Sequence, residues 1–166
     1  MCGILAALGQ QIDYDKVKSA SKLMAHRGPD ESDYVISSSG FMLCHERLSI
    51  IDLHSGKQPI QGASEAYMIH NGEIYNYQDL KAKEFPNTIF RTTSDSEVIV
   101  HLYEKYGDEF LDMLDGVFAF VAVNQDQFIV ARDPIGVKPL YYGYDELKQL
   151  YVASEMKALM SLCTTV

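Results

Sequence analysis

Apolar residues along the chain fall into short runs that are bounded by turn-forming residues, a spacing typical of β-strands. These runs predict strands at Cys2 to Leu8, Asp33 to Ser37, Phe41 to His45, Tyr67 to His70, Val117 to Val123, Gln127 to Ala131, Leu140 to Tyr144 and Leu150 to Ala153. Several of them are apolar throughout instead of alternating, which favours strands that are buried on both faces.

Helical spacing is found in fewer segments. It predicts helices at Tyr14 to Ala25, Tyr77 to Lys83 and Ser96 to Tyr106. The last is the clearest, because Val98, Ile99 and Leu102 recur on one face behind polar residues that favour a helix start. Hairpin signals between the strands indicate antiparallel pairing, and sheets covered on both sides need helices outside them. We therefore predict an α+β fold, with two mainly antiparallel sheets stacked between helical layers.

Length and charge limit the classes of protein to which the chain can belong. Its 166 residues, 47% of them hydrophobic, suit one domain with a sizeable core, and no linker or repeat divides them. The formal net charge of −9 at pH 7 would repel a phosphate backbone. We therefore expect no nucleic-acid partner.

Cysteine usage and hydropathy indicate a cytoplasmic protein. Cys2, Cys44 and Cys163 cannot all pair with one another, and none lies in a CxxC pair of the kind that zinc sites favour. No apolar run approaches the roughly 18 residues of a membrane span, and a signal-peptide pattern is missing. The sequence thus predicts no metal site, no membrane association and a reducing compartment.

The first candidate for chemistry is Cys2, which is followed by Gly3 and an apolar run. Removal of Met1 would leave a thiol and a free α-amine on one residue. An α-amine titrates near ~7.7 to 8 and can take the thiol proton at neutral pH. The alternative, which this residue alone leaves open, is a small apolar side chain that opens a buried strand.

A polar cluster at residues 70–76 is the second candidate. We interpret Asn71 and Gly72 as lying in a turn directly after the strand that ends at His70. An Asn amide beside a Gly backbone N–H can also aim two donors at one point, which a tetrahedral oxyanion requires. An ordinary turn is the open alternative.

Arg47 and Asp95 form the third candidate. A guanidinium can hold an α-carboxylate in a bidentate fork, and a carboxylate can hold an α-ammonium. Together they would bind a free amino acid. The alternatives are a surface ion pair for Arg47 and a helix N-cap for Asp95. The segments at residues 26–30 and 132–142 predict tight turns that are stabilised by buried ion pairs.

Taken in order, the motifs resemble those of class II glutamine amidotransferases, which are N-terminal nucleophile hydrolases. The similarity is greatest to the glutaminase domain of glutamine-using asparagine synthetases, and it covers essentially the whole chain. The motifs are MCGI at residues 1–4, HRGPD at 26–30, HERLSIID at 45–52, NGEIYN at 71–76, TTSDSEV at 92–98, RDPIGVKPLYY at 132–142 and YVASEMKAL at 151–159.

This resemblance implies a four-layer αββα fold and a role for each candidate residue. Cys2 would be the nucleophile that attacks the side-chain amide of L-glutamine, with Asn71 and Gly72 as the oxyanion hole. Arg47 and Asp95 would hold the α-carboxylate and the α-amine. The pocket would be lined by Leu48, Ser49, Ile50, Ile51 and Glu73. No cofactor is expected in this domain.

The sequence departs from the resembled enzymes at its end. Such enzymes continue into a synthetase domain with a Ser-Gly-Gly-rich pyrophosphate loop, and residues 1–166 contain no such loop. ATP and magnesium are thus expected only in a synthetase domain or subunit that accepts the ammonia. The chain would be an excised glutaminase domain or a stand-alone protein, and its oligomeric state is open, with a homodimer among the alternatives.

Two rival hypotheses remain at this point. An internal cysteine hydrolase could use Cys44 with a histidine such as His45, although neighbouring residues of a strand point to opposite faces. A catalytically inactive module that binds glutamine or regulates a synthetase is the non-enzymatic alternative.

Overall fold

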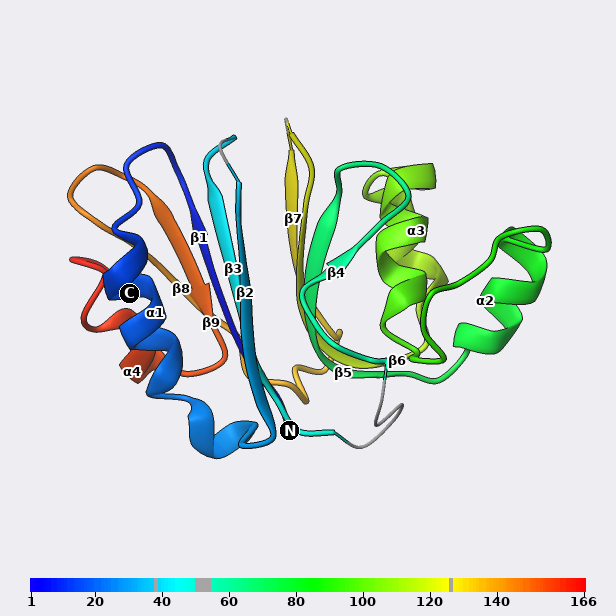
Figure 1. Ribbon diagram of the computed structural model, residues 1–166, viewed down its shortest axis with the longest axis horizontal. Helices are drawn as coiled ribbons and strands as arrows, with labels where there is room; N and C mark the ends of the chain where they lie inside the picture. The colour runs from blue at the N-terminus through cyan, green and yellow to red at the C-terminus, as the bar shows by residue number, and fades with distance from the viewer. Residues whose placement is uncertain (38, 50–54, 126) are drawn as a thin grey trace.

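A computed structural model describes residues 1–37, 39–49, 55–125 and 127–166. Two antiparallel sheets are stacked face to face, and a helical layer covers the outer face of each (Figure 1). The predicted four-layer αββα arrangement is thereby confirmed. The N-terminus lies between the lower ends of the two sheets (Figure 1), and the C-terminal residues lie beside the edge of the first sheet, where Thr165 forms a bridge with Tyr144.

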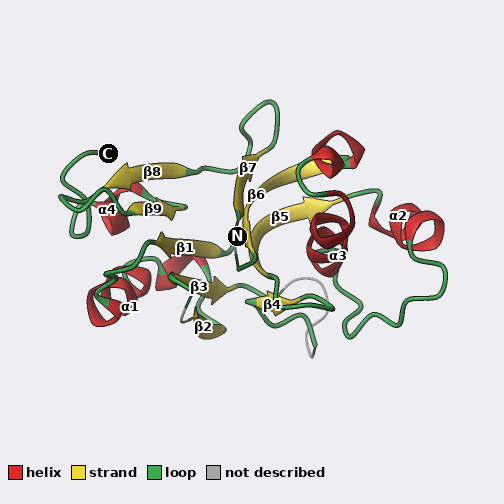
Figure 2. Cartoon of the chain, turned by 90° about the horizontal axis from the view of Figure 1, so that it is seen from above, coloured by secondary structure: helices red, strands yellow, loops and turns green. Residues whose placement is uncertain are grey.

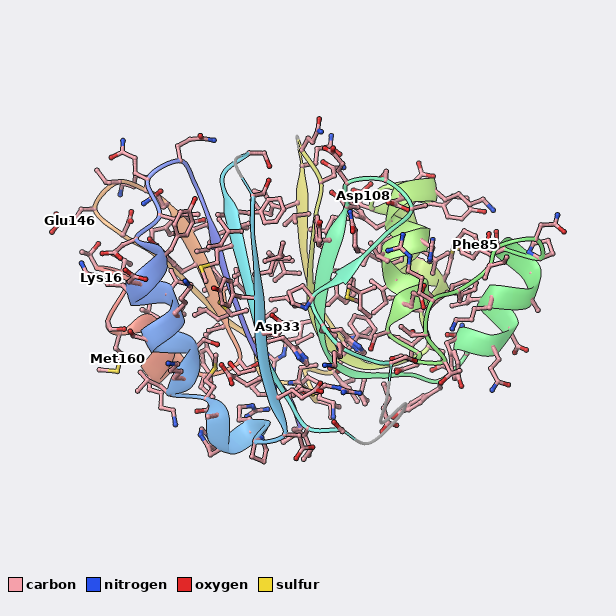
Figure 3. The ribbon with its side chains drawn as sticks, in the orientation of Figure 1. Lys16, Asp33, Phe85, Asp108, Glu146 and Met160 are labelled. Atoms are coloured by element: carbon pink, nitrogen blue, oxygen red, sulfur yellow. The ribbon has the colours of Figure 1, made fainter. Side chains whose placement is uncertain are left out.

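The first sheet is built around the N-terminal strand. Its order is β2 (Glu31–Ser37), β3 (Phe41–Arg47), β1 (Gly3–Leu8), β9 (Leu150–Ala153) and β8 (Tyr141–Tyr144). All six residues of β1 are buried, because the strand is central and both its faces are covered. The helices that cover its outer face are α1 (Tyr14–Lys22) and α4 (Met156–Leu159). Lys16 and Met160 lie on the outside of this layer (Figure 3).

The second sheet has the order β4 (Ile60–Gln61), β5 (Tyr67–Ile74), β6 (Gly116–Val123) and β7 (Phe128–Arg132). The helices α2 (Tyr77–Glu84) and α3 (Glu97–Tyr106) lie outside it (Figure 2). The predicted apolar face of α3 is buried, and it packs with Met68, Phe118 and Phe120 of the sheet.

Three clusters of buried side chains follow from the layers. One fills the space between the sheets, with Ile4 and Leu43 facing Ile69 and Val121. The other two lie between each sheet and its helices. Side chains fill the layers throughout (Figure 3). Because strand residues alternate between faces, a residue's position in the register decides whether it points to the other sheet or to a helix.

The largest difference from the predicted elements concerns residues 71–74. They were predicted to lie in a turn, but β5 continues through them to Ile74 and pairs with β6, with Asn71 opposite Ala119 and Gly72 opposite Phe118. Strand pairing over eight residues outweighs the local turn preference of an Asn-Gly pair. Helix α1 also ends earlier than predicted, at Lys22, and a 3₁₀ turn follows it at Ala25–Arg27.

The two predicted tight turns are stabilised differently from expectation. Arg27 forms an ion pair with Glu155, at 3.1 Å, and not with an acid of its own turn. Asp133, which is buried, accepts hydrogen bonds from the backbone N–H groups of Val137 and Lys138 at 2.8 and 3.0 Å. A buried carboxylate that accepts several N–H groups closes a turn without a cationic partner.

None of the described helices is long and apolar enough to cross a membrane.

Candidate active site

Strand register places Cys2 beside Arg47. In the β1–β3 pairing, Gly3 lies opposite Glu46 and Ile4 lies opposite His45, so that Cys2 and Arg47 each follow directly after the last pair of the ladder. Paired residues share a face. Ile4 belongs to the cluster between the sheets, so its partner His45 also points toward the second sheet. Side chains alternate along a strand, so Arg47, two residues after His45, points the same way.

The second sheet contributes Asn71 from the facing strand. Ile69 packs between the sheets, whereas Met68 and Ile74 pack against the helical layer, so Asn71 points toward the first sheet. Gly72 is required by close packing, because a Cβ atom there would lie 2.1 Å from the carbonyl oxygen of Val117. A glycine inside a strand often marks such an approach.

These residues meet at one cavity, which lies at the end of the sandwich where the chain begins. Its lining includes the predicted site residues Cys2, Arg47, Leu48, Asn71, Gly72, Glu73 and Asp95. It also includes Met1, His45, Gly56, Gln58, His70, Ser94, Ser96 and Lys138. Six separate regions of the chain, residues 1–2, 45–48, 56–58, 70–73, 94–96 and 138, thus contribute to this one cavity.

The Cys2 thiol is positioned by backbone contacts. The N–H of Leu48 donates to Cys2 Sγ at 3.5 Å, and the Leu48 carbonyl oxygen lies 3.7 Å from the same sulfur. Arg27 Nε donates to the Cys2 carbonyl oxygen at 3.0 Å. Burial raises the pKa of the thiol, and the Leu48 N–H, the charged N-terminus and the nearby arginines offset this rise in part. The sulfur therefore needs a base to become a thiolate at neutral pH.

Asn71 presents an unused donor. The residue is buried, and its side-chain Nδ2 has no hydrogen-bond partner among the described residues. An unpaired buried donor costs about 1 to 3 kcal/mol relative to a satisfied one. A hydrogen-bond acceptor that enters the cavity would satisfy this donor. An oxyanion that develops in a transition state would form the strongest hydrogen bond with it.

The Arg47 side chain is buried, and a residue of its own sheet holds it in place. Its Nη1 donates to Glu31 Oε2 at 2.7 Å, and Glu31 is the residue directly opposite it in the β2–β3 pairing. Lys57 lies 3.4 Å from the other carboxylate oxygen of Glu31. These contacts lower the pKa of Glu31. The Glu31 carboxylate thereby fixes one side of the guanidinium, and the Arg47 side chain lines the cavity.

Asp95 lies just before α3 but does not cap it. Its Oδ2 accepts a hydrogen bond from the backbone N–H of Ile74 at 2.8 Å, which links the loop to the end of β5. Ser94 Oγ donates to the other oxygen at 3.3 Å. Burial raises the pKa of Asp95, while these donors partly oppose the rise. Asp95 thus lines the cavity from the side of the second sheet, to which its carboxylate is linked through Ile74.

The remaining predicted pocket residues differ in their placement. Leu48 and Glu73 line the cavity. Ser49 donates its backbone N–H to Asp30 Oδ2 at 2.7 Å and is not among the lining residues. Ile50 and Ile51 lie outside the described residues. Their place in a glutamine pocket stays a prediction.

Sequence reasoning did not assign His45, Gln58, His70 and Lys138 to the site. His45 Nε2 lies 3.2 Å from the His70 carbonyl oxygen, to which Gln58 Nε2 also donates at 3.2 Å. A signal for His45 was present, because it stands two residues before Arg47 on the same strand and therefore shares its face. Gln58 and Lys138 come from loops, for which the pattern offers no such signal.

The structure excludes a pair of Cys44 and His45. Cys44 is buried against α1 in the outer cluster, whereas His45 points to the second sheet and contacts His70. Burial raises the pKa of the Cys44 thiol to about 12, so it remains protonated. The expected alternation of strand residues is the reason that these neighbours do not meet.

Comparison with known proteins shows the family to which the chain belongs. The family model described as "Glutamine amidotransferase domain" matches residues 1–166. The chain is 45% identical to the glutamine-hydrolysing asparagine synthetase B of Escherichia coli, over 100% of this chain and 31% of that protein. It is 46% identical to the glutamine-hydrolysing asparagine synthetase 2 of Arabidopsis thaliana, over 98% of this chain and 29% of that protein.

Among solved structures, the fold is similar to that of the glutamine phosphoribosylpyrophosphate amidotransferase from B. subtilis. The TM-score is 0.81 at 24% identity, and the match covers 96% of this chain and 43% of that one. At this identity the likeness concerns the fold alone. The chain spans less than a third of the length of the curated relatives named above. It belongs to the glutamine amidotransferase domain family.

Proposed function

We propose that this domain hydrolyses the side-chain amide of L-glutamine to glutamate and ammonia, with Cys2 as the nucleophile. The observation that supports the proposal most is the convergence of Cys2 Sγ and the unpaired Nδ2 of Asn71 on one cavity, to which Arg47 and Asp95 also contribute. A nucleophile, an oxyanion donor and two opposite charges for a zwitterion are the groups that acyl transfer from a free amino acid requires.

The first half of the reaction forms a thioester. Once Met1 is removed, the α-amine of Cys2 takes the thiol proton, and the sulfur attacks the γ-carbonyl carbon. Asn71 Nδ2 and the Gly72 N–H meet the oxyanion as it develops. The α-ammonium returns its proton to the amide nitrogen, the C–N bond breaks, and ammonia leaves a γ-glutamyl thioester on Cys2.

The second half of the reaction releases glutamate. The α-amine takes a proton from a water molecule, whose oxygen attacks the thioester carbonyl, again opposite the Asn71 donor. The C–S bond breaks, and the sulfur regains a proton from the α-ammonium. The balance is glutamine and water to glutamate and ammonia. In this proposal only protein groups and water take part, so no metal or organic cofactor is required.

Charge complementarity supports glutamine as the substrate. Arg47 would hold the α-carboxylate and Asp95 the α-ammonium, which places the side chain between them and the sulfur. The Glu31 contact keeps one side of the Arg47 guanidinium occupied. Because free rotation of a long side chain is thereby reduced, less entropy is lost when the substrate binds.

We further propose that the ammonia is destined for an ATP-dependent ligase domain of the asparagine synthetase type. The similarity to relatives that are about three times longer supports this destination, since this chain aligns with 31% of one and 29% of another. ATP and magnesium would be bound by that domain. The proposed hydrolysis itself is tested by measuring glutamate and ammonia release from the chain after Met1 has been removed. Tight glutamine binding without release of either product would instead support an inactive binding module.

Replacing Asn71 with Ala is expected to lower kcat by about 10² to 10³, because an oxyanion donor contributes mainly in the transition state. KM for glutamine should change little. Steady-state glutamate release measures both constants. Asn87→Ala, which removes an exposed amide in the loop after α2, is the matched control and should keep the wild-type kcat. An Asn71→Ala enzyme with wild-type kcat would remove Asn71 from the oxyanion hole.

Replacing Arg47 with Ala is expected to raise KM for glutamine with a smaller effect on kcat. A charge-assisted hydrogen bond contributes about 1.5 to 3 kcal/mol, which corresponds to about 10- to 10²-fold in KM. Asp95→Ala should behave similarly, because it removes the contact with the α-ammonium. Arg91→Ala serves as the control, since the Arg91 side chain is exposed and outside the cavity. Equal KM values for wild type and both clamp variants would refute the two assignments.

A further inference from the structure

Two residues that line the cavity and face the space between the sheets each have a buried polar atom with no hydrogen-bond partner among the described residues. One atom is Asn71 Nδ2, a donor, and the other is His45 Nδ1. Both residues line the cavity together with Cys2, and both point into the space between the sheets. His70 lines the same cavity and its Nε2 is also unpaired among the described residues, but its side chain lies on the helix-facing side of β5, where Nδ1 lies 2.9 Å from Ser96 Oγ.

The contact of His45 with β5 decides which ring nitrogen carries the proton. Nε2 lies 3.2 Å from the His70 carbonyl oxygen, and a carbonyl oxygen can only accept a hydrogen bond. Nε2 must therefore be the donor. Burial lowers the pKa of His45 to about 3, so the ring is neutral near pH 7. In a neutral imidazole with the proton on Nε2, Nδ1 is an acceptor with a free lone pair.

The ring is also fixed in place. The backbone of His45 lies in β3, paired with Ile4 of β1 on one side and with Asp33 of β2 on the other. The peptide that it contacts is held by Gln58, whose Nε2 donates to the His70 carbonyl oxygen and whose Oε1 accepts from the His70 N–H at 2.6 Å. The acceptor at Nδ1 is consequently preorganised, because neither the ring nor its contact can turn without breaking these bonds.

A fixed donor and a fixed acceptor on one cavity match a primary carboxamide, which has one carbonyl oxygen to accept and two N–H groups to donate. We propose that His45 determines specificity for glutamine over glutamate, by accepting a hydrogen bond from the γ-amide nitrogen at Nδ1 while Asn71 donates to the γ-carbonyl oxygen. The inference rests on the proposed function and adds to it the group that recognises the leaving nitrogen.

The preference for glutamine over glutamate follows from the hydrogen-bond donor that a carboxylate lacks. Glutamate has no hydrogen to donate at this position when it is ionised, so its second oxygen would face the lone pair of Nδ1. A site that is built to hydrogen-bond an N–H group disfavours a ligand without one, because the buried acceptor stays unpaired. The same mismatch would arise as soon as product forms, and it would favour release of glutamate.

Two substitutions of His45 separate this role from a structural one. His45→Asn keeps an acceptor near the position of Nδ1 and loses the bond to His70, whereas His45→Gln keeps a donor near the position of Nε2 and loses the acceptor. The readout is discrimination, defined as kcat/KM for glutamine multiplied by the inhibition constant of glutamate. We expect His45→Gln to lower it about 10-fold and His45→Asn to change it less than about 3-fold.

The opposite ranking would overturn the proposal, because a purely structural His45 needs its bond to His70 and tolerates Gln better than Asn. His101→Gln, which removes a buried imidazole from α3 outside the cavity, is the matched control and should keep wild-type discrimination. Thermal unfolding of each variant reports the structural effect separately.

A measurement that needs no substitution at His45 provides the second test. In a trimmed Cys2→Ala chain with ¹⁵N-labelled histidine, saturation with glutamine should move the His45 Nδ1 resonance toward that of a hydrogen-bonded acceptor. A Nδ1 resonance that stays in place at saturation would refute the contact. Failure of the inference is distinguishable from failure of the proposed function, because in the first case the wild-type chain still releases glutamate and in the second it does not.

Discussion

A chain that retains Met1 is expected to fold normally and to release essentially no glutamate. With Met1 in place, the nitrogen of Cys2 belongs to a peptide bond, and its delocalised lone pair cannot accept a proton at neutral pH. Burial already raises the pKa of the thiol, so the fraction of thiolate without a base falls below the few per cent of a free cysteine at pH 7. Met1 also lines the cavity in the structure, where it occupies space beside the sulfur.

Trimming is the matched experiment, since it changes the N-terminus alone. Treatment with an aminopeptidase should restore glutamate release in proportion to the trimmed fraction, which mass spectrometry measures in each sample. The positions of Leu48 and Arg27 around Cys2 should be preserved, because both contact atoms that trimming does not remove. A preparation shown to keep Met1 and to hydrolyse glutamine at the trimmed rate would contradict the role of the α-amine.

Replacement of Cys2 by Ala is expected to abolish glutamate formation while the fold is retained. The change removes one sulfur atom at the end of a strand, and the neighbouring Gly3–Leu8 ladder does not depend on it. Without the sulfur, neither the attack on the γ-carbonyl carbon nor the thioester can occur. Trimmed Cys2→Ala should still bind glutamine, because Arg47 and Asp95 remain, and calorimetry can measure this binding.

Cys163→Ala is the control for this substitution. Cys163 is partly buried near Gly143, on the outer side of the first sheet, and it is not among the residues that line the cavity. The control should therefore keep wild-type turnover. Glutaminase activity that persists in trimmed Cys2→Ala, or that disappears in Cys163→Ala, would show that another cysteine carries the reaction.

Much of the architecture follows from local pattern. Helix α3 is recognisable because burial of one face requires apolar residues at helical spacing. Strand β6 is recognisable because burial of both faces requires a continuous apolar run. Residues 71–74 show where local preference misleads. Asn71 and Gly72 have the composition of a turn, yet pairing with β6 and the close approach of Val117 place them inside a strand.

The partners of the site residues were less predictable for a physical reason. Glu31 precedes Arg47 by sixteen positions, and the two meet only because the β2–β3 register places them opposite each other. Register depends on the whole hairpin and not on either residue. The contact of His45 with His70 crosses from one sheet to the other, so it arises from the stacking of layers, which no periodicity encodes.

The central claim is that Cys2 is the nucleophile, and covalent labelling tests it most directly. The trimmed wild-type chain is incubated with an electrophilic glutamine analogue, and peptide mass mapping then locates the adduct while residual glutaminase activity is followed. We expect one adduct on Cys2, formed in parallel with the loss of activity and prevented by excess glutamine. An adduct on Cys44 or Cys163, or loss of activity while Cys2 stays unmodified, would contradict the account.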